Sequence, residues 1–218
     1  PLFDRRAVRF DYTLSQGTGC TLETVITLDR REVVRLSHNA FGRTGSFAVP
    51  LDSADTLKQC DFFEELCWTP ERPLLFDVQF IVKREGETLD RVRSYFGMRK
   101  VSVEDGVFML NDRPYYQKLV LDQGYWPDSL LTAPDEAFIK DIQLIKQMGF
   151  NGVRKHQKVE DPRFLYHADR MGLLVWGEIG SAYVYSPNVA CRLYREWQEA
   201  VLRDINHPCI VAWTPLNE

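Results

Sequence analysis

Apolar and polar side chains alternate along the first half of the chain. In residues 21–28 (TLETVITL) and 74–82 (LLFDVQFIV), apolar or β-branched side chains recur at every second position, the period of a strand with one buried face. Similar short segments are VRFDYTL, EVVRLSH, SFAVPL and RVRSYFG. Because these segments are short, separated by turn-prone residues and almost free of helical pattern, they predict an immunoglobulin-like β-sandwich over residues 1–102.

From residue 103 onward the pattern changes to strands that alternate with helices. Residues 134–149 have the period of a helix, with four apolar residues on one face: Phe138, Ile142, Ile145 and Met148. Further helices are expected at 162–172 and 188–206, and strands at 115–122, 151–156, 173–179 and 209–218. The strands are apolar without alternation, as in a parallel sheet covered on both faces. Four consecutive strand–helix units predict such a sheet, either doubly wound or half of a barrel.

The length of this second half bears on how complete the fold is. A (β/α)₈ barrel takes about 250 residues, and residues 103–218 provide roughly half of that. The series stops on a strand, which leaves an unpaired edge and uncovered apolar surface. We therefore expect a truncated fragment, an immunoglobulin-like sandwich followed by the first half of a TIM barrel. The open edge also predicts a homo-oligomer.

Composition excludes several function classes. The formal net charge is −4, from 27 basic and 31 acidic residues, so no basic surface for nucleic acid or membranes is expected. The five cysteines are widely spaced and form no metal-ligand pattern, which favours reduced, packed thiols and predicts neither a metal nor a cofactor. No apolar run approaches the roughly 18 residues of a membrane span. The start, PLFDRRAVRF, does not resemble a signal peptide, so a cytoplasmic location is expected.

Candidate chemistry gathers where the predicted parallel strands end, since ligands bind at the carboxyl ends of such strands. The residues there are Asp122, Arg154-Lys155-His156, Trp176 to Glu178, and Asn217-Glu218. Carboxylates and amides bond hydroxyl groups and indole faces stack on apolar ring faces, so this rim suits a hydroxyl-rich substrate. Glycoside hydrolysis needs a carboxylic acid to protonate the departing oxygen and a second carboxylate across the ring. Glu218, beside Asn217, is a candidate for the first.

Each of these residues also has a structural interpretation. Arg154 and Glu178 are candidates for ion pairs with neighbouring charges, and Trp176 and Trp213 are candidates for core or barrel-filling residues. His156 lacks the companions that a metal site needs, and Glu218 has the interpretation of a solvated terminus. The residues alone therefore support an enzyme-like rim and leave its chemistry open.

The last sixteen residues, RDINHPCIVAWTPLNE (203–218), resemble the acid/base signature of glycoside hydrolase family 2, which includes β-galactosidases, β-glucuronidases and β-mannosidases. That signature reads R-D-x-N-H-P-S-I-x-x-W-S-x-x-N-E, and Cys209 and Thr214 are small-residue variations on it. Other segments resemble the family in the same order: CWTPERPLLFDVQF (67–80), YFGMRKV (95–101), DGVFMLNDRPYYQK (105–118) and DIQLIKQMGFNGVRKH (141–156).

The resemblance implies a retaining glycosidase that cleaves terminal β-glycosides, with Glu218 as its general acid/base. Asn217 would bond the 2-hydroxyl of the sugar, and Arg154 would help to hold the acidic centre. The family's nucleophile is a glutamate on a later barrel strand, past residue 218, so the fragment is expected to be inactive by itself. The alternative is a non-catalytic carbohydrate-binding or scaffold protein on the same fold.

Two segments depart from the family pattern. Where the family often reads R-T-S-H, this chain has Arg154-Lys155-His156-Gln157, and where the family often reads G-V-N-R-H, it has LVLDQGYW. Asp122 and Trp126 are therefore expected to shape a different pocket, and the sugar is not assigned. The expected substrate-binding residues are Asn217, Arg154, His156, Asp122 and Trp176.

Overall fold

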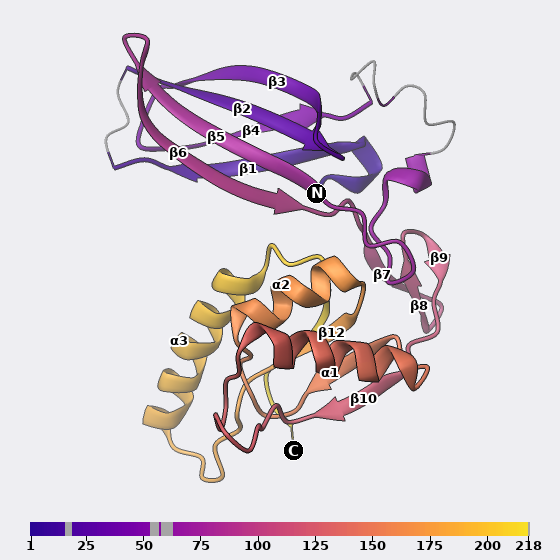
Figure 1. Ribbon diagram of the computed structural model, residues 1–218. Helices are drawn as coiled ribbons and strands as arrows, with labels where there is room; N and C mark the ends of the chain where they lie inside the picture. The colour runs from indigo at the N-terminus through magenta and orange to yellow at the C-terminus, as the bar shows by residue number, and fades with distance from the viewer. Residues whose placement is uncertain (16–18, 53–56, 58–62, 218) are drawn as a thin grey trace. The chain divides into compact units, whose positions relative to one another are not determined.

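The computed structural model describes residues 1–15, 19–52, 57 and 63–217. The chain divides into two compact units (Figure 1). Unit 1 comprises Pro1–Trp68 and Leu74–Lys100, and unit 2 comprises Thr69–Pro73 and Val101–Glu218. Each unit has its own sheets and its own buried residues.

Unit 1 contains two antiparallel sheets, as the alternating pattern predicts. One pairs β1 (Ala7–Thr13) with β4 (Thr44–Pro50). The other has the order β3-β2-β5-β6, built from β3 (Arg31–Ala40), β2 (Cys20–Leu28), β5 (Phe76–Arg84) and β6 (Glu87–Phe96). Two short 3₁₀ helices, Phe3–Arg5 and Phe63–Leu66, complete its regular structure within the described residues.

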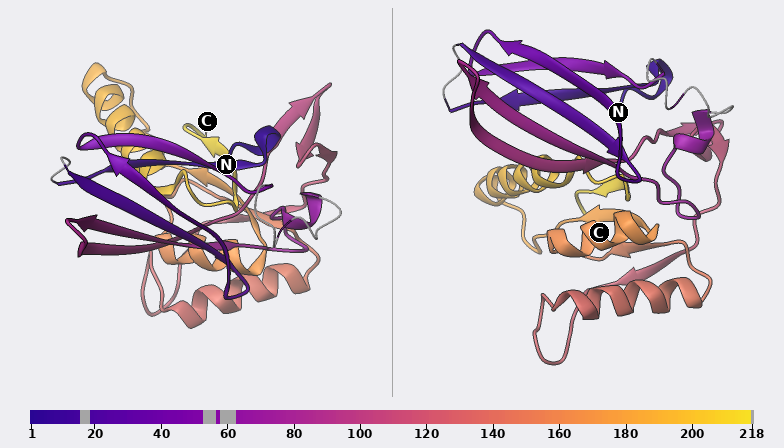
Figure 2. Two further views of the ribbon diagram at one scale, coloured as in Figure 1. Left: turned by 90° about the horizontal axis from the view of Figure 1, so that it is seen from above. Right: turned by 45° about the horizontal axis from the view of Figure 1, so that its top comes forward.

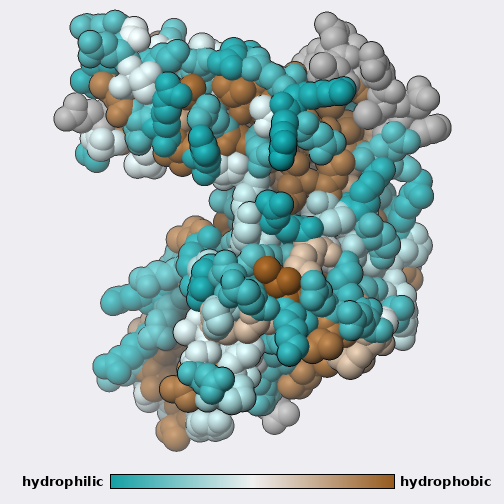
Figure 3. Space-filling view, in the orientation of Figure 1, coloured by the Kyte–Doolittle hydropathy of each residue, from teal (hydrophilic) through white to brown (hydrophobic). Residues whose placement is uncertain are grey.

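The core of unit 1 is apolar and lies between these sheets. Ile26 of β2 and Phe76 of β5 are fully buried, and Val49 of β4 reaches them from the other sheet. The Phe76 and Phe96 rings stack with centroids 5.0 Å apart, which ties β5 to β6. β6 is an edge strand, and Figure 3 shows hydrophilic residues among apolar ones on the visible surface of unit 1. Charges on an edge oppose pairing with another chain.

A small antiparallel sheet opens unit 2, and the sequence analysis did not predict it. Its strands are β7 (Val101–Glu104), β8 (Val107–Leu110) and β9 (Arg113–Pro114). Both connections are two-residue turns with positive φ at each position: Asp105 and Gly106 at 50° and 79°, Asn111 and Asp112 at 55° and 61°. Such angles are those of type I′ hairpin turns, which Asp-Gly favours.

The rest of unit 2 is a parallel sheet with helices, and its strand order decides between the two predicted architectures. The strands are β10 (Leu119–Asp122), β11 (Gly152–Lys155), β12 (Leu174–Glu178) and β13 (Ile210–Thr214). They lie in chain order, all parallel. A doubly wound sheet reverses its order at a switch point, whereas a barrel does not. The sheet is therefore the first half of a barrel.

Three helices connect these strands: α1 (Asp135–Gln147), α2 (Pro162–Met171) and α3 (Pro187–Asp204). α1 and α2 lie side by side (Figures 1 and 2). Phe138, Ile142 and Ile145 of α1 are buried as expected, but Met148, the fourth member of the predicted stripe, is 63% exposed because it lies at the C-cap. No helix in the described ranges is both long and apolar enough to cross a membrane.

Cys20, Cys67 and Cys209 are buried, as expected for packed cysteines, whereas Cys191 is exposed. Cys60 lies outside the described residues.

Candidate active site

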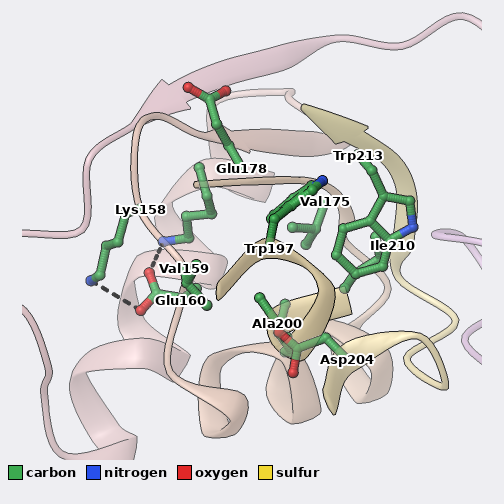
Figure 4. A pocket seen from close by; sticks show the side chains of 13 residues that line it. Lys158, Val159, Glu160, Val175, Glu178, Trp197, Ala200, Asp204, Ile210 and Trp213 are labelled. Atoms are coloured by element: carbon green, nitrogen blue, oxygen red, sulfur yellow. Dashed lines mark ion pairs between the residues drawn. The ribbon is translucent and has the colours of Figure 1, made fainter. Parts of the chain in front are cut away.

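The candidate residues of unit 2 lie where the four parallel strands end, and successive residues face opposite sides of the sheet. On β11, Lys155 faces the helices, because its ammonium lies 3.6 Å from the centre of the Phe164 ring of α2. Its neighbour Arg154 therefore faces the other side, which is the interior of a barrel. Figure 4 shows the Glu178 carboxylate directed away from Trp197 of α3, toward that same side.

Arg154, Glu178 and Asn217 form one hydrogen-bonded group on the interior face. Arg154 Nε donates to Glu178 Oε2 at 2.7 Å, and Nη2 donates to Glu178 Oε1 at 3.3 Å. The same Nη2 donates to Asn217 Oδ1 at 2.7 Å. Arg154 thus links the ends of β11 and β12 to the segment that follows β13.

The Glu178 carboxylate of this group is buried and fully paired. The Glu178 side chain has no exposed surface, and the Arg154 side chain is 30% exposed. Glu178 Oε1 also accepts from the backbone N–H of Gln157 at 2.9 Å, so both carboxylate oxygens are engaged. A buried carboxylate is tolerated only when it is paired and hydrogen-bonded in this way. The ion-pair interpretations of Arg154 and Glu178 are therefore both correct.

Asn217 is held at a second point, by a contact that the sequence analysis missed. Its backbone N–H donates to Ser181 Oγ at 3.0 Å, and the backbone N–H of Ser181 donates to Gln157 Oε1 at 3.3 Å. Because the Asn217 side-chain oxygen accepts from Arg154, its amide NH₂ group is the side that can donate to a ligand. Glu218, the predicted general acid/base, follows directly but lies outside the described residues.

A second group of charges lies on the helix-facing side at the ends of β10 and β11. Lys155 Nζ is 2.6 Å from Asp122 Oδ2 and 2.7 Å from Glu160 Oε2, and Lys158 Nζ is 3.0 Å from Glu160 Oε1. The side chains of Lys155 and Glu160 are 1% and 2% exposed. Lys158 also donates to the carbonyl of Gly124 at 2.8 Å, which fixes the loop after β10.

This buried group connects the two segments that depart from the family pattern. Asp122 comes from LVLDQGYW and Lys155 from Arg154-Lys155-His156-Gln157, and the two side chains pair with each other. Asp122 Oδ1 accepts from the backbone N–H of Gly124 at 2.7 Å, so both of its oxygens have protein partners. Its expected substrate contact therefore stays a prediction.

The two remaining predicted residues have partners outside the Arg154 group. His156 Nδ1 is 3.2 Å from Gln123 Nε2, and its backbone N–H donates to the carbonyl of Asp122 at 2.9 Å. Trp176 Nε1 donates to Gln117 Oε1 at 2.7 Å. Both side chains are partly buried. Of the predicted set, the structure thus brings Arg154 and Asn217 together.

A small pocket lies between α3 and the sheet (Figure 4). The apolar part of its lining includes Val175, Ile210, Trp197 and Trp213, and the two indole rings meet edge to face with centroids 5.6 Å apart. Trp213 thus packs in the layer between sheet and helix. The charged part of the lining includes Lys155, Lys158 and Glu160 of the second group and Glu178 of the Arg154 group.

Asp169, His207 and Cys209 offer three metal-ligand atoms within 4.8 Å of one another. However, Asp169 Oδ2 lies 2.6 Å from His207 Nδ1, which is a hydrogen-bond distance, and Oδ1 accepts from the backbone N–H of Cys209 at 2.8 Å. The side chain of Asp169 is fully buried. In this geometry the three residues hold the start of β13 against α2.

Comparison with known proteins places this fold in a family. Residues 6–99 match the family model for glycosyl hydrolases family 2, and residues 101–218, more than half of the chain, match the model for the TIM barrel domain of that family. The chain belongs to glycosyl hydrolase family 2. The resemblance inferred from its last sixteen residues is therefore confirmed.

Curated relatives that match the chain include two β-galactosidases. A β-galactosidase of Photobacterium profundum is 31% identical over 161 residues, which cover 69% of this chain and 16% of that protein. A β-galactosidase of Thermoanaerobacter pseudethanolicus is 31% identical over 162 residues, covering 73% of this chain and 22% of that protein. The chain thus matches about a sixth to a fifth of the length of these relatives.

Two similar structures are β-glucuronidases. That of Parabacteroides merdae superposes with a TM-score of 0.77 at 16% identity, covering 95% of this chain and 26% of that one. An FMN-binding β-glucuronidase of Facaelibacterium prausnitzii L2-6 gives 0.78 at 21% identity, covering 96% and 32%. At these identities the likeness supports the fold: an immunoglobulin-like sandwich followed by the first part of a TIM barrel.

Proposed function

We propose that residues 1–218 supply the proton-donor half of the active site of a retaining β-glycosidase. Glu218 is the general acid/base, and its role rests on the family signature in which it lies. The observation that carries the proposal is the position of Asn217, the preceding residue. It is fixed by Arg154 at its side chain and by Ser181 at its backbone, so the residue that precedes Glu218 in the signature has a defined position.

The proposed reaction has two displacements at the anomeric carbon. First, a carboxylate nucleophile attacks C1, the C1–O bond to the leaving group breaks, and Glu218 gives its proton to the departing oxygen. Then water attacks C1, Glu218 takes a proton from that water, and the bond to the nucleophile breaks. We place the nucleophile outside residues 1–218. Because the two carboxyl groups act as a unit, residues 1–218 alone are expected to be inactive.

The other residues have supporting roles in this proposal. The Asn217 NH₂ group donates to the 2-hydroxyl of the sugar, an interaction that strengthens in the transition state. Arg154 keeps Asn217 in place, and the buried Glu178 carboxylate balances the positive charge of Arg154. Asp122, His156 and Trp176 are proposed to shape or contact the sugar site. The substrate is a terminal β-glycoside, a carbohydrate whose sugar is not assigned.

The test uses a panel of aryl β-glycosides with the protein expressed from its complete reading frame, alongside residues 1–218 alone. We expect the complete protein to cleave at least one glycoside and residues 1–218 to cleave none. The Glu218→Ala variant should lose most of its activity toward poorly activated leaving groups, which need protonation. Glu196→Ala, an exposed glutamate on α3, is the matched control and should behave as wild type.

Azide distinguishes a proton donor from a nucleophile. With a dinitrophenyl glycoside, which departs without protonation, Glu218→Ala should accumulate a glycosyl-enzyme. Azide then attacks C1, the bond to the enzyme carboxylate breaks, and a glycosyl azide of retained configuration forms. Inverted configuration would identify Glu218 as the nucleophile instead. If the complete protein binds sugars and cleaves none, the alternative of a non-catalytic carbohydrate-binding or scaffold protein replaces this proposal.

The expected homo-oligomer also remains a proposal. β10 and β13 form the two edges of the described parallel sheet, and an exposed edge promotes pairing between chains. Light scattering on residues 1–218 should therefore give a mass of at least twice 25.4 kDa. A monomer would contradict it.

A further inference from the structure

Three side chains that the proposed reaction does not use meet at the start of β13. Asp169 lies on α2, His207 lies between α3 and β13, and Cys209 directly precedes β13. One carboxylate oxygen, one imidazole nitrogen and the Cys209 sulfur all lie within 4.8 Å of one another. Carboxylate, imidazole and thiolate are the side-chain ligands that zinc takes in proteins. The spacing of the cysteines does not reveal this combination, because its members come from separate segments.

The separations between these atoms are close to those of a tetrahedral zinc site. Tetrahedral ligands at about 2.0–2.3 Å from the ion are about 3.3–3.6 Å from one another. His207 Nδ1 and Asp169 Oδ2 are 2.6 Å apart, so they need to separate by only about 0.7 Å to admit an ion. The Leu165 carbonyl oxygen lies 3.6 Å from Cys209 Sγ, which is the separation expected of an oxygen and a sulfur ligand.

The surroundings of the three side chains are those of an enclosed structural site. The side chains of Asp169 and His207 are 0% and 15% exposed, and Cys209 is fully buried. Asp169 Oδ1 accepts from the backbone N–H of Cys209 at 2.8 Å, while Oδ2 faces His207. A hydrogen bond to the second oxygen of a carboxylate orients the first oxygen for a metal. Ionised Asp169 and Cys209 together also balance the charge of a divalent cation, as burial requires.

Cys209 is the residue that suits this group to a metal. The family signature has serine at this position, and a hydroxyl is a poor zinc ligand, whereas a thiolate is a good one. The backbone on both sides of the sulfur is fixed. The Cys209 carbonyl accepts from the N–H of Val175 in β12 at 2.8 Å, and the Ile210 N–H donates to the His207 carbonyl at 3.2 Å. The sulfur is therefore presented from a defined position.

We propose that Asp169 Oδ2, His207 Nδ1 and Cys209 Sγ bind a zinc ion, with the Leu165 carbonyl oxygen as the fourth ligand. An ionised carboxylate only accepts hydrogen bonds, so His207 Nδ1 carries the proton in its bond to Asp169. When zinc binds, the imidazole carries its proton on Nε2 instead, and the Cys209 thiol releases its proton to solvent as the S–Zn bond forms. One proton is released per ion, and the ion links α2 to the start of β13.

The test titrates Zn²⁺ into the protein expressed from its complete reading frame, after dialysis against a chelator. Calorimetry in two buffers of different ionisation enthalpy measures both affinity and proton release. Wild type should bind one Zn²⁺ with release of about one proton, and Cys209→Ser should bind that ion about 100-fold more weakly or not at all. Excess Zn²⁺ should raise the urea midpoint of wild type but not that of Cys209→Ser.

Co²⁺ in place of Zn²⁺ reports the ligands directly. Wild type should show the near-ultraviolet charge-transfer absorption of a cobalt–thiolate bond and the strong visible bands of tetrahedral Co²⁺, and Cys209→Ser should show neither. Cys191→Ser is the matched control, because Cys191 is an exposed cysteine on α3, and it should keep both signals.

Three results would overturn the inference. Signals that disappear in Cys191→Ser, or that persist in Cys209→Ser, would show adventitious binding at another site. Wild type without thiolate absorption would show that Asp169, His207 and Cys209 only form hydrogen bonds. Because serine is the signature residue at this position, Cys209→Ser should fold, and an unchanged urea midpoint without added metal checks this. No measurement here depends on glycosidase activity, so the result is independent of the proposed function.

Discussion

The two units differ in how far their charged side chains are exposed to solvent. In unit 1, several ion pairs lie on the surface: Arg35 and Glu32 are 50% and 46% exposed, and Arg9 and Asp11 are 55% and 67% exposed. Glu23 is an exception, with a side chain that is 11% exposed, but its partners Arg35 and Lys83 are 50% and 37% exposed. In unit 2, several charged side chains are buried where parallel strands end. Examples are Lys155, Glu160 and Glu178, at 1%, 2% and 0%. Among the described residues, the sandwich thus buries one carboxylate whose cationic partners are exposed, whereas the half-barrel buries a cation and carboxylates together.

This difference suggests a role for the buried charges of unit 2 in positioning loops. Burying an ion pair costs desolvation that the pairing does not always recover, so such pairs are weak evidence for stability. Here they hold loops: Lys158 binds the Gly124 carbonyl, and Glu178 binds the Gln157 N–H and Arg154. Our hypothesis is that unit 2 keeps buried charge to fix the loops around its site. The predictions below test that difference.

The largest effect is expected when the shared cation of the buried group is removed. Lys155→Met leaves Asp122 and Glu160 next to each other without the ammonium that separates them. Breaking one partner out of a buried pair costs about 3–5 kcal/mol of unfolding free energy. Urea unfolding followed by tryptophan fluorescence measures this, because four of the five tryptophans lie in unit 2: Trp126, Trp176, Trp197 and Trp213.

A matched change in unit 1 sharpens the comparison. Lys83 pairs with Glu23 but is 37% exposed, and Arg35 pairs with the same carboxylate. Lys83→Met should therefore cost less than about 1 kcal/mol. Adding Asp122→Asn to Lys155→Met should restore part of the loss, because it removes one unpaired carboxylate. Equal costs for the two lysine variants would contradict the contrast between the units.

A smaller effect on stability, but a clear one on catalysis, is expected from Arg154→Lys. Lysine keeps the positive charge beside Glu178 but cannot donate to Glu178 and Asn217 in the forked geometry that Arg154 uses. Losing one hydrogen bond to a charged group should lower kcat/KM by about 10- to 100-fold in the complete protein. Arg195→Lys on α3 is the control. Unchanged kinetics would mean that Arg154 serves only as the ion-pair partner of Glu178 and does not position Asn217 for catalysis.

Local sequence pattern predicts the elements of unit 2 better than their ends. The strand expected at 115–122 begins only at Leu119, because the Tyr115 N–H bonds back to Phe108 of the small sheet. The strand expected at 209–218 ends at Thr214, since Pro215 has no N–H to donate. The hairpins of residues 101–114 carried a visible Asp105-Gly106 signal that was not used. Such ends depend on hydrogen bonds to distant segments, which periodicity does not record.

The sequence likewise predicts some residues of the candidate site and not others. The rule that ligands bind at strand ends brought Arg154 and Asn217 together from the sequence. Ser181 and Gln157 were missed because loop contacts leave no periodic pattern. The burial of Lys155 was missed because lysine is almost always exposed unless it is paired, and its partners come from separate segments. Glu178 was anticipated as a partner for a neighbouring cation, which proved to be Arg154.

The smallest effect is expected at Asp161, an N-cap of intermediate exposure. Its carboxylate accepts from the Arg163 side chain and N–H and from Thr132, and these bonds, the Arg163 side chain first, hold its pKa below the ordinary value. A lowered folded-state pKa stabilises the fold above the unfolded pKa of about 3.9, and that stability is lost as pH falls further. Asp161→Asn keeps a good N-cap but loses the charge, so it should cost about 1 kcal/mol at pH 7.

The pH dependence separates this explanation from a simple loss of packing. The difference in unfolding free energy between wild type and Asp161→Asn should be constant above about pH 5 and shrink below about pH 4, because the Asp161 carboxylate of the unfolded wild type takes up a proton while the folded one stays ionised. Asp11→Asn in unit 1 removes a carboxylate that is 67% exposed and should change stability by less than about 0.5 kcal/mol at any pH. A cost for Asp161→Asn that persists unchanged at low pH would show that the asparagine disturbs the cap itself. In that case, charged side chains of unit 2 would contribute to stability at the buried strand ends but not at the start of α2. The difference between the units would then apply only to the candidate site.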